Sequence, residues 1–158
     1  KYLSELGFGS PKLIVEPGRS IVGRAGVAIY TVGAIKNIPG VRKYVSLDGG
    51  MGDNIRPALY GAQYEAVIAN KTSLIDEEIV TLAGKYCESG DILIKDIKLP
   101  KLDSGDVVAI PASGAYAPSM ASNYNLNPRP PIALVNEGVP RLIRERETFQ
   151  DMMKTDVK

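Results

Sequence analysis

Short β-rich runs separated by turn residues dominate the chain from Val27 onward, and they restrict it to a mainly β fold. Valine, isoleucine, threonine and tyrosine gather in these runs, and glycine, proline or aspartate closes most of them. Many short strands of this kind are typical of an antiparallel barrel or sandwich. The expected strands are residues 27–32, 43–47, 64–69, 78–83, 92–94, 97–99 and 107–110 and a hairpin over 132–143, with short helices within 51–61, from 114 and over 147–154.

The first 25 residues follow a different pattern. Residues 1–8 have the spacing of an amphipathic helix, which a Gly-Ser-Pro sequence ends. Residues 13–15 form an apolar run that predicts a buried strand ending at Glu16. A helix, a short loop and a buried strand are the repeat of an α/β unit. We therefore expect residues 1–25 to be the end of an α/β domain and residues 26–158 to be a β-domain, in a fragment of a longer polypeptide.

The composition excludes several kinds of site. The 158 residues contain one cysteine and no histidine, so the chain can form neither an internal disulfide, nor a His-ligated metal site, nor a Ser-His-Asp triad. A net charge of +1 argues against a nucleic-acid surface, and no apolar run is long enough to span a bilayer. We expect no metal, no nucleic acid and no membrane as partners.

Glu16-Pro17-Gly18-Arg19 follows the expected strand directly. Pro17 fixes its own backbone torsion, and Gly18 permits a turn that other residues resist. The carboxylate of Glu16 and the guanidinium of Arg19 would then lie close together beyond the sheet. Such a pair suits a ligand with one cationic and one anionic part, and it equally suits a strand end closed by a surface ion pair.

Two further segments offer ligand-binding side chains. Arg56 and Tyr60 are four residues apart, so a helical turn would place them on one face, where a guanidinium and a phenol can bind a carboxylate. A surface arginine packed on a tyrosine is the alternative. Gly114 and Ala115 would let the backbone approach a ligand closely, and Tyr116 could hydrogen-bond it; the alternative is a core tyrosine at a strand end.

Cys87 and Glu88 lie in a turn-rich segment that ends at Asp91. A lone cysteine is most often a small buried hydrophobe, but an adjacent carboxylate and a glycine turn are not a core context. In a strand the two side chains would point to opposite faces, so they can meet one ligand only from a loop. Glu88 would then bind an ammonium group and Cys87 would deliver a proton. A buried thiol beside a solvated acid is the alternative.

Five segments, taken in order, resemble those of a known family. They are similar to the C-terminal part of the diaminopimelate decarboxylases, which are pyridoxal 5'-phosphate enzymes of the alanine-racemase-like fold (fold type III). The Cys-Glu-Ser-Gly-Asp segment discriminates best, because related ornithine decarboxylases follow the cysteine with Asp. Gly52 stands where many members carry a larger residue. The segments are Glu16-Pro17-Gly18-Arg19, Asp48-Gly49-Gly50-Met51, Arg56-Pro57-Ala58-Leu59-Tyr60, Cys87-Glu88-Ser89-Gly90-Asp91 and Gly114-Ala115-Tyr116.

The resemblance implies that residues 1–25 end a pyridoxal-phosphate-binding TIM-like barrel and that residues 26–158 form a C-terminal β-barrel domain. Glu16 would pair with the pyridinium nitrogen of the cofactor, at the carboxyl end of a barrel strand. The Schiff-base lysine would belong to the barrel, so the chain alone should be inactive. The implied cofactor-binding residues are Glu16, Pro17, Gly18, Arg19 and Tyr116.

The same resemblance assigns substrate and catalytic roles. Meso-2,6-diaminopimelate would be decarboxylated to L-lysine and carbon dioxide. The arginines and Tyr60 would hold its distal carboxylate, and Glu88 its distal ammonium group. Cys87, the implied catalytic residue, would protonate the carbon from which carbon dioxide departs. The implied substrate-binding residues are Arg19, Arg56, Tyr60, Glu88 and Tyr116.

The resemblance further implies a cytoplasmic homodimer whose site is shared across the interface, with the Cys-Glu segment supplied by the partner chain. Two alternatives stand beside it. One is a related decarboxylase that acts on ornithine, lysine, arginine or carboxynorspermidine. The other is a non-enzymatic β-domain for binding or assembly, against which the barrel-like first 25 residues argue.

Overall fold

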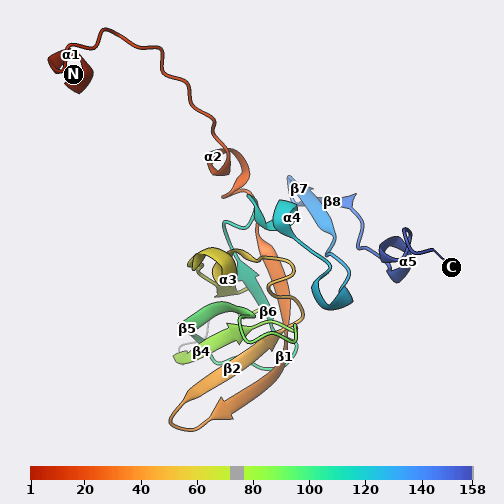
Figure 1. The fold of residues 1–158 in the computed structure, drawn as a ribbon. Coiled ribbons are helices and arrows are strands. Elements are labelled where there is room, and N and C mark those ends of the chain that lie inside the picture. Colours follow the sequence, from red (N-terminus) through yellow and green to blue (C-terminus); the bar gives the residue numbers. More distant parts are fainter. Residues whose placement is uncertain (72–76, 158) are drawn as a thin grey trace.

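The computed structural model describes residues 1–71 and 77–157, and six of its strands form one sheet. These strands are β1 (Ala28–Ile38), β2 (Arg42–Leu47), β3 (Val67–Ile68), β4 (Glu77–Ala83), β5 (Ile92–Pro100) and β6 (Val107–Ile110). Their order is β3-β6-β1-β2-β4-β5, and the edge strands β3 and β5 also contact each other, so the sheet nearly closes into a barrel (Figure 1). The predicted mainly β fold is confirmed.

Alternating apolar and polar residues explain why the strands pack on one side. In β1, Tyr30 and Val32 are buried and Thr31 between them is exposed. Because successive side chains of a strand point to opposite faces, this alternation gives the sheet one apolar face. Each fully buried Val or Leu stabilises the fold by about 1.5–3 kcal/mol. The buried core comprises Tyr30, Val32, Val45, Leu47, Ala66, Ile68, Val80, Leu82, Leu93, Ile94, Leu99, Leu102, Val108 and Ile110.

The strand pairing is mainly antiparallel, as predicted, with one parallel pair. β1 pairs antiparallel with β2 and with β6, and β4 pairs antiparallel with β5. β2 and β4 run parallel, with Tyr44 opposite Thr81. A long connection joins these two strands in place of a tight turn, which is what a parallel pair requires.

The strands predicted at 92–94 and 97–99 are one continuous strand, β5. Asp96 interrupts its regular backbone with a φ of 53°. The carboxylate of Asp96 accepts hydrogen bonds from Nε of Arg42 (2.8 Å) and from the hydroxyl of Thr81 (3.1 Å). These bonds hold Asp96 within the strand. The break that the sequence predicts between residues 94 and 97 is therefore a local distortion of one continuous strand.

Two other strand boundaries were wrong. The strand predicted at 27–32 continues as β1 to Ile38, past a register shift against β2. In the strand predicted at 64–69, only Val67–Ile68 pair as β3. The predicted strand residues before β3 belong instead to the connection from α3, and two of them, Tyr64 and Glu65, line a cavity.

The helices of the β-domain are short. The helices expected within 51–61, from 114 and over 147–154 are confirmed, but each covers fewer residues than expected, and the 3-10 helix at Tyr124–Leu126 was not predicted. Thr148 caps the last helix. Its hydroxyl oxygen accepts a hydrogen bond from the backbone N–H of Asp151, and the carboxylate of Asp151 accepts one from the backbone N–H of Thr148. Among the residues that the structure describes, no helix has the length and apolar character needed to cross a membrane. These elements are α3 (Arg56–Tyr60), α4 (Ala117–Met120), the 3-10 helix η1 (Tyr124–Leu126) and α5 (Phe149–Met152).

The predicted hairpin over 132–143 forms a second sheet of two strands, β7 (Ile132–Asn136) and β8 (Val139–Arg144). Glu137 and Gly138 both have positive φ, as a tight hairpin turn requires. Beyond the hairpin, the carboxylate of Glu147 accepts hydrogen bonds from the side chain of Asn123 (2.6 Å) and from the backbone and guanidinium of Arg129. Glu147 therefore links the segment after β8 to the connection before β7.

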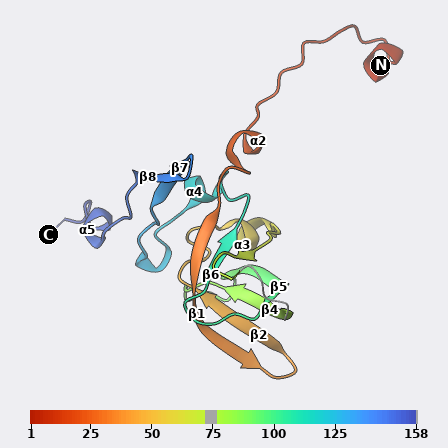
Figure 2. The same cartoon turned by 180° about the vertical axis from the view of Figure 1, so that it is seen from behind.

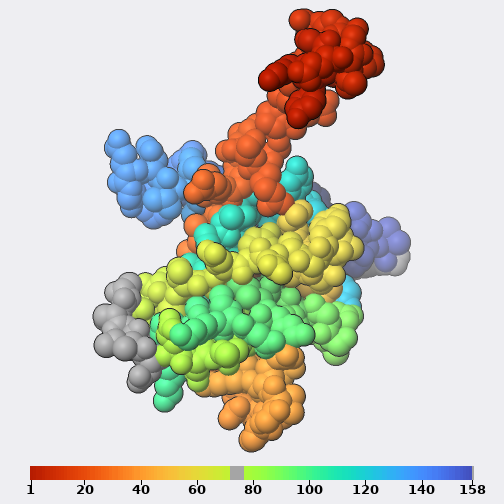
Figure 3. All heavy atoms as spheres, turned by 90° about the vertical axis from the view of Figure 1, so that its left-hand side faces the viewer, coloured from red at the N-terminus to blue at the C-terminus, as the bar shows by residue number. Residues whose placement is uncertain are grey.

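The N-terminal segment extends away from the sheet (Figures 1 and 2). It contains two short helices, α1 (Tyr2–Glu5) and α2 (Arg19–Val22). The prediction of a buried strand at 13–16 was wrong for this structure: Leu13, Ile14 and Val15 are 81%, 74% and 71% exposed and pair with no described strand. A strand needs a neighbour for its backbone hydrogen bonds, and this segment has none beside it (Figure 3).

Candidate functional site

A buried carboxylate ties together two of the loops that carry motifs. Asp91 accepts hydrogen bonds from the backbone N–H groups of Met51 (2.6 Å) and Tyr86 (2.8 Å). Gly50 and Gly84 lie so close to this carboxylate that a Cβ on either would collide with it. Burial raises the pKa of Asp91, and the two backbone N–H groups oppose that rise. The Asp-Gly-Gly-Met segment is thus a turn that holds the Cys-Glu loop.

Gly52, the departure from the family pattern, also has a packing role. A Cβ at this position would collide with the phenol of Tyr86. A larger residue would therefore displace Tyr86, whose backbone is held by Asp91.

α3 presents an arginine and a tyrosine on one face, as predicted. Pro57 lies in its first turn, and Gly61, with a φ of 61°, ends it. The guanidinium carbon of Arg56 lies 5.2 Å from the centroid of the Tyr60 ring, within the range of a cation–π contact. This contact by itself fits both binding and packing.

Tyr116 brings Arg56 together with Arg19. The guanidinium carbon of each arginine lies 5.4 Å from the centroid of its ring. Tyr116 has a φ of 68°, in the left-handed region that a tyrosine rarely adopts, and it is 44% exposed. It is therefore not a core tyrosine at a strand end; its ring is in contact with two guanidinium groups.

Glycines make room for this ring. A Cβ at Gly18 would lie 2.5 Å from the hydroxyl oxygen of Tyr116, and a Cβ at Gly114 would collide with the carbonyl oxygen of Val22. The backbone N–H of Gly114 donates to the carbonyl of Gly23 (3.1 Å), which joins α2 to the loop before Tyr116. A cavity of about 310 Å³ lies here, lined by Gly18, Val22, Gly114, Ala115, Tyr116, Pro118 and Ser119.

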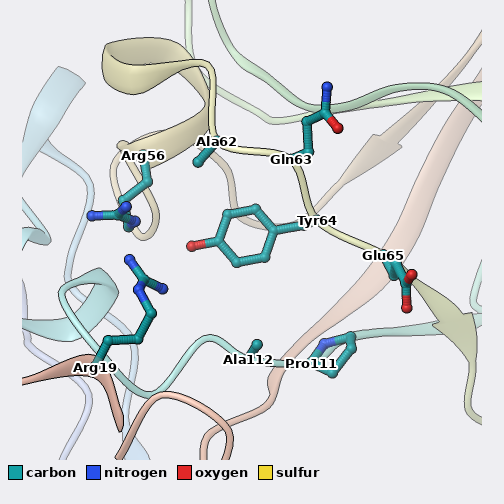
Figure 4. Close-up of a pocket in the computed structure, with 8 residues that line it drawn as sticks. All are labelled: Arg19, Arg56, Ala62, Gln63, Tyr64, Glu65, Pro111 and Ala112. Carbon is teal, nitrogen blue, oxygen red and sulfur yellow. The ribbon is translucent and has the colours of Figure 1, made fainter. Parts of the chain in front are cut away.

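A larger cavity, of about 470 Å³, opens beside the two arginines (Figure 4). Arg19 reaches it from α2 and Arg56 from α3, and their guanidinium groups point toward one another. Tyr64, from the chain before β3, directs its hydroxyl toward both. The other residues that line the cavity are Ala62, Gln63, Glu65, Pro111 and Ala112.

Tyr64 is a site residue that the sequence reasoning missed. The sequence pattern predicts it as the first residue of a strand over 64–69. A signal was present, because Tyr64 follows Tyr60 and Arg56 at intervals of four. The helix ends at Gly61, however, so that spacing alone would not have placed Tyr64 correctly.

The two guanidinium groups have no acidic partner in the described part of the chain. Neither arginine forms an ion pair there, and Figure 4 shows the side chain of Glu65 directed away from both. Two like charges that face each other repel, and an anion between them removes that repulsion. The arrangement therefore suits a carboxylate or a phosphate, which a guanidinium binds with two parallel hydrogen bonds.

Cys87 and Glu88 lie on an exposed loop, as predicted, and outside both cavities. The backbone N–H of Cys87 donates to Oδ1 of Asn125 (2.9 Å). The carboxylate of Glu88 accepts from the backbone N–H of Gly90 (3.2 Å) and from the hydroxyl of Tyr124 (3.1 Å), and these bonds lower the pKa of Glu88. Glu88 is thus an ionised acceptor that faces solvent.

Glu16 is exposed and lies outside both cavities. It forms no ion pair with Arg19 within the described residues, so the surface-pair interpretation of this motif was wrong. Arg19 instead begins α2 and turns to Tyr116. Of the residues predicted for the site, the single chain brings together Gly18, Arg19, Arg56, Tyr60 and Tyr116, but not Glu16, Cys87 or Glu88.

Known proteins resemble this chain over almost its whole length. It is 53% identical over 154 residues to the diaminopimelate decarboxylase of Bacillus subtilis (strain 168), covering 98% of this chain and 35% of that protein. It is 44% identical to the diaminopimelate decarboxylase of Mycobacterium tuberculosis (strain ATCC 25618 / H37Rv), covering 97% and 35%. The chain thus spans about a third of the length of these relatives.

Solved structures and a family model agree with this. The crystal structure of diaminopimelate decarboxylase from M. jannaschii matches with a TM-score of 0.88 and 41% identity, covering 99% of this chain and 36% of that one. A lysine/ornithine decarboxylase from Vibrio vulnificus matches less well, with a TM-score of 0.64, 28% identity and coverage of 72% and 31%. Residues 20–114 match the C-terminal sheet domain of the pyridoxal-dependent decarboxylases. The chain therefore belongs to the pyridoxal-dependent decarboxylase family, and its nearly closed barrel is the C-terminal sheet domain of that family.

Proposed function

We propose that this chain is the C-terminal part of a diaminopimelate decarboxylase, which converts meso-2,6-diaminopimelate to L-lysine and carbon dioxide in lysine biosynthesis. The observation that carries the proposal is the pair of guanidinium groups, Arg19 and Arg56, that share the ring of Tyr116 and open onto one cavity. The relatives that carry this name support it.

The distal end of the substrate explains why two arginines are needed. Meso-diaminopimelate has an amino acid at both ends, so a carboxylate remains at the end that does not react. Lysine and ornithine, reacting at their own α-carbon, have no carboxylate at the distal end and would leave Arg19 and Arg56 unpaired. A binding group with a buried atom that the wrong substrate leaves unpaired, such as Nε of Arg56, discriminates against that substrate.

The remaining roles follow from the same substrate. Tyr60 would hold the distal carboxylate together with the arginines, and Tyr116 would touch both cofactor and substrate. Glu88, ionised and held by Gly90 and Tyr124, would accept the distal ammonium group. Cys87 would give a proton to the carbon that loses carbon dioxide. Its exposed, loop-borne thiol supports that role, because a core thiol could not reach a ligand.

The smaller cavity fits one edge of pyridoxal 5'-phosphate, which the family implies. Its lining around Gly18, Gly114 and Ala115 is almost free of side chains, and a Cβ at Gly18 would fill the space against the Tyr116 hydroxyl. Residues 16–19 and Tyr116 would hold the group, with Glu16 beside its ring nitrogen. When bound, it supplies the electron sink for the bond to the departing carbon dioxide.

The proposal includes the domain organisation and the assembly. Residues 1–25 would be the end of the cofactor-binding barrel, and residues 26–158 the β-barrel domain. The exposure of Leu13, Ile14 and Val15 supports this, because apolar side chains in a row are normally covered. Cys87 and Glu88, which lie outside both cavities of their own chain, would complete the site of a second subunit in a cytoplasmic homodimer. A free, exposed thiol is compatible with that reducing compartment.

The full-length protein tests this directly. Purified with pyridoxal phosphate, it should release carbon dioxide from meso-diaminopimelate at least about 100-fold more efficiently than from L-ornithine, L-lysine, L-arginine or carboxynorspermidine. Turnover of one of the other four amines with none of meso-diaminopimelate would assign a related decarboxylase instead. Absence of turnover and of cofactor absorbance would favour a binding or assembly domain.

A further inference from the structure

Two residues that line the larger cavity each have a buried polar atom without a hydrogen-bond partner among the described residues. These atoms are Nε of Arg56 and the hydroxyl oxygen of Tyr64. Buried polar groups are almost always hydrogen-bonded, and the exceptions mark places where a ligand, an ion or a water molecule completes the bonding. Both residues line one cavity, so one ligand can satisfy both atoms.

The position of the Tyr64 hydroxyl is set by the fold. The ring of Tyr64 packs against the hydrophobic core of the sheet, which leaves the hydroxyl little freedom of direction. Figure 4 shows it directed toward the guanidinium groups of Arg56 and Arg19. A guanidinium has only donors, so neither arginine can accept the hydroxyl proton. The proton of Tyr64 therefore needs an acceptor that the cavity itself does not offer there.

A carboxylate supplies what these three groups lack. It has two oxygens that together accept about four hydrogen bonds, and its charge offsets those of two guanidinium groups. An ammonium group would add a third positive charge and accept nothing. Among the tyrosines near Arg56, Tyr60 is 61% exposed and offers its ring face, whereas the hydroxyl of Tyr64 is buried at the cavity wall.

We propose that Tyr64 is a specificity-determining residue, whose hydroxyl donates to the distal carboxylate of the substrate together with Arg19 and Arg56. This inference rests on the proposed function, since that substrate carries the carboxylate. It adds a third donor to the two arginines and explains why a tyrosine with a buried, unpartnered hydroxyl stands at this point of the wall.

Tyr64→Phe in the full-length holoenzyme tests the proposal, because phenylalanine keeps the ring and removes only the hydroxyl. Two probes differ in one group: L-lysine, bound through the amine at its reacting end, retains the distal carboxylate, and 1,5-diaminopentane lacks it. Calorimetry should show L-lysine binding about tenfold more weakly to Tyr64→Phe than to the wild type, and 1,5-diaminopentane changing less than about twofold. Tyr44→Phe, a half-buried tyrosine outside both cavities, is the matched control and should change neither.

The outcomes separate this inference from the proposed function. Equal weakening of both probes would mean that Tyr64 only shapes the site, and no weakening of either would mean that its hydroxyl makes no bond; each overturns the inference. A wild type that prefers L-lysine to 1,5-diaminopentane, but does not turn over meso-diaminopimelate, would overturn the proposed function while the Tyr64 comparison still decides the inference. A wild type that binds both probes equally overturns the carboxylate site and the role of Tyr64 with it.

Discussion

Arg19 and Arg56 place their guanidinium carbons at the same distance, 5.4 Å, from the centre of one tyrosine ring, that of Tyr116. The two arginines are 37 positions apart in the sequence and come from α2 and α3. Tyr116 thus joins the N-terminal segment to the sheet domain at the point where an anion would bind. Each guanidinium lies within the range of a cation–π contact with that ring.

Arg56→Lys should weaken substrate binding by about 10–100-fold, because lysine keeps the charge but loses the planar fork and the stacking on the rings of Tyr60 and Tyr116. Steady-state kinetics of the full-length protein should show the loss mainly in KM for meso-diaminopimelate. Arg42→Lys is the control, since Arg42 also lies over a tyrosine ring but is bound to Asp96 away from the cavities. An unchanged KM in Arg56→Lys would contradict a role in holding the carboxylate.

Gly18→Ala should impair cofactor binding, and a second substitution should repair it. The added methyl group would lie 2.5 Å from the hydroxyl oxygen of Tyr116 but 3.5 Å from the ring carbon that bears it. Removing the hydroxyl in Gly18→Ala/Tyr116→Phe therefore relieves the clash. Cofactor absorbance of the full-length variants should fall in Gly18→Ala and recover in the double variant to the level of Tyr116→Phe alone. If the double variant binds no better than Gly18→Ala, this contact does not limit the site.

Cys87→Ala should lower turnover far more than cofactor binding, because the proposed role of the thiol is proton delivery and not retention of the cofactor. The measurement is kcat with meso-diaminopimelate beside the cofactor absorbance of the same preparation. Ser104→Ala, in an exposed turn, is the control. Equal loss of both quantities would assign Cys87 a structural role.

Mixing two inactive variants tests whether Cys87 serves the partner subunit. If it does, subunits of Cys87→Ala and Arg56→Ala that exchange at random should regain about a quarter of the wild-type activity, since half of the dimers are mixed and each mixed dimer holds one intact site. Neither variant alone should be active. No recovery, with subunit exchange demonstrated, would place both residues in the site of one chain.

Glu147 should make the fold sensitive to acid. Hydrogen bonds from the side chain and backbone of Arg129 lower the pKa of Glu147 from its ordinary value of 4.5 to about 2. Because the folded-state pKa is the lower one, the stabilisation is present above about pH 4.5 and is lost as the pH falls toward 2. It amounts to about 1–2 kcal/mol near neutral pH, allowing for solvent screening.

Thermal unfolding of the full-length protein at pH 7 and at pH 3 checks this. Glu147→Gln should lower Tm at pH 7 and reduce the difference between the two pH values. Glu145→Gln, an exposed acid two residues away, should leave both unchanged. A Glu147→Gln variant with the wild-type pH dependence would show that the contacts with Arg129 and Asn123 do not titrate in this range.

Much of the fold could be predicted because local patterns determine it. Alternation around Tyr30 and Val32 identifies β1, and the glycine turn before Asp91 places Cys87 and Glu88 on a loop, as the structure has them. The continuation of β5 through Asp96 as a single strand could not be predicted, because it depends on hydrogen bonds from Arg42 and Thr81, which lie on other strands. Such partners are distant in the sequence and leave no local signal.

The site was predictable only in part for the same reason. Arg56 and Tyr60 could be paired by their spacing on one helix, but the meeting of Arg19 with Arg56 depends on how the turn at Tyr116 is placed. Tyr64 was missed because the local sequence pattern predicts a strand there. Its role depends on its position in the wall of the cavity, which only the folded chain forms. Side chains that act across separate elements become visible only once the elements are assembled.

The close crossing of Val22 and Gly114 has a consequence for how this site can vary. No methyl group fits between the two backbones, and the hydrogen bond from Gly114 to Gly23 holds them together. A shift of the segment that carries Arg19 must therefore be transmitted to the turn that carries Tyr116. Arg19 and Tyr116 therefore move together, whereas Arg56 lies on α3, outside this crossing, so adaptation to a longer or shorter ligand falls to α3 and to the cavity wall that Ala62 lines.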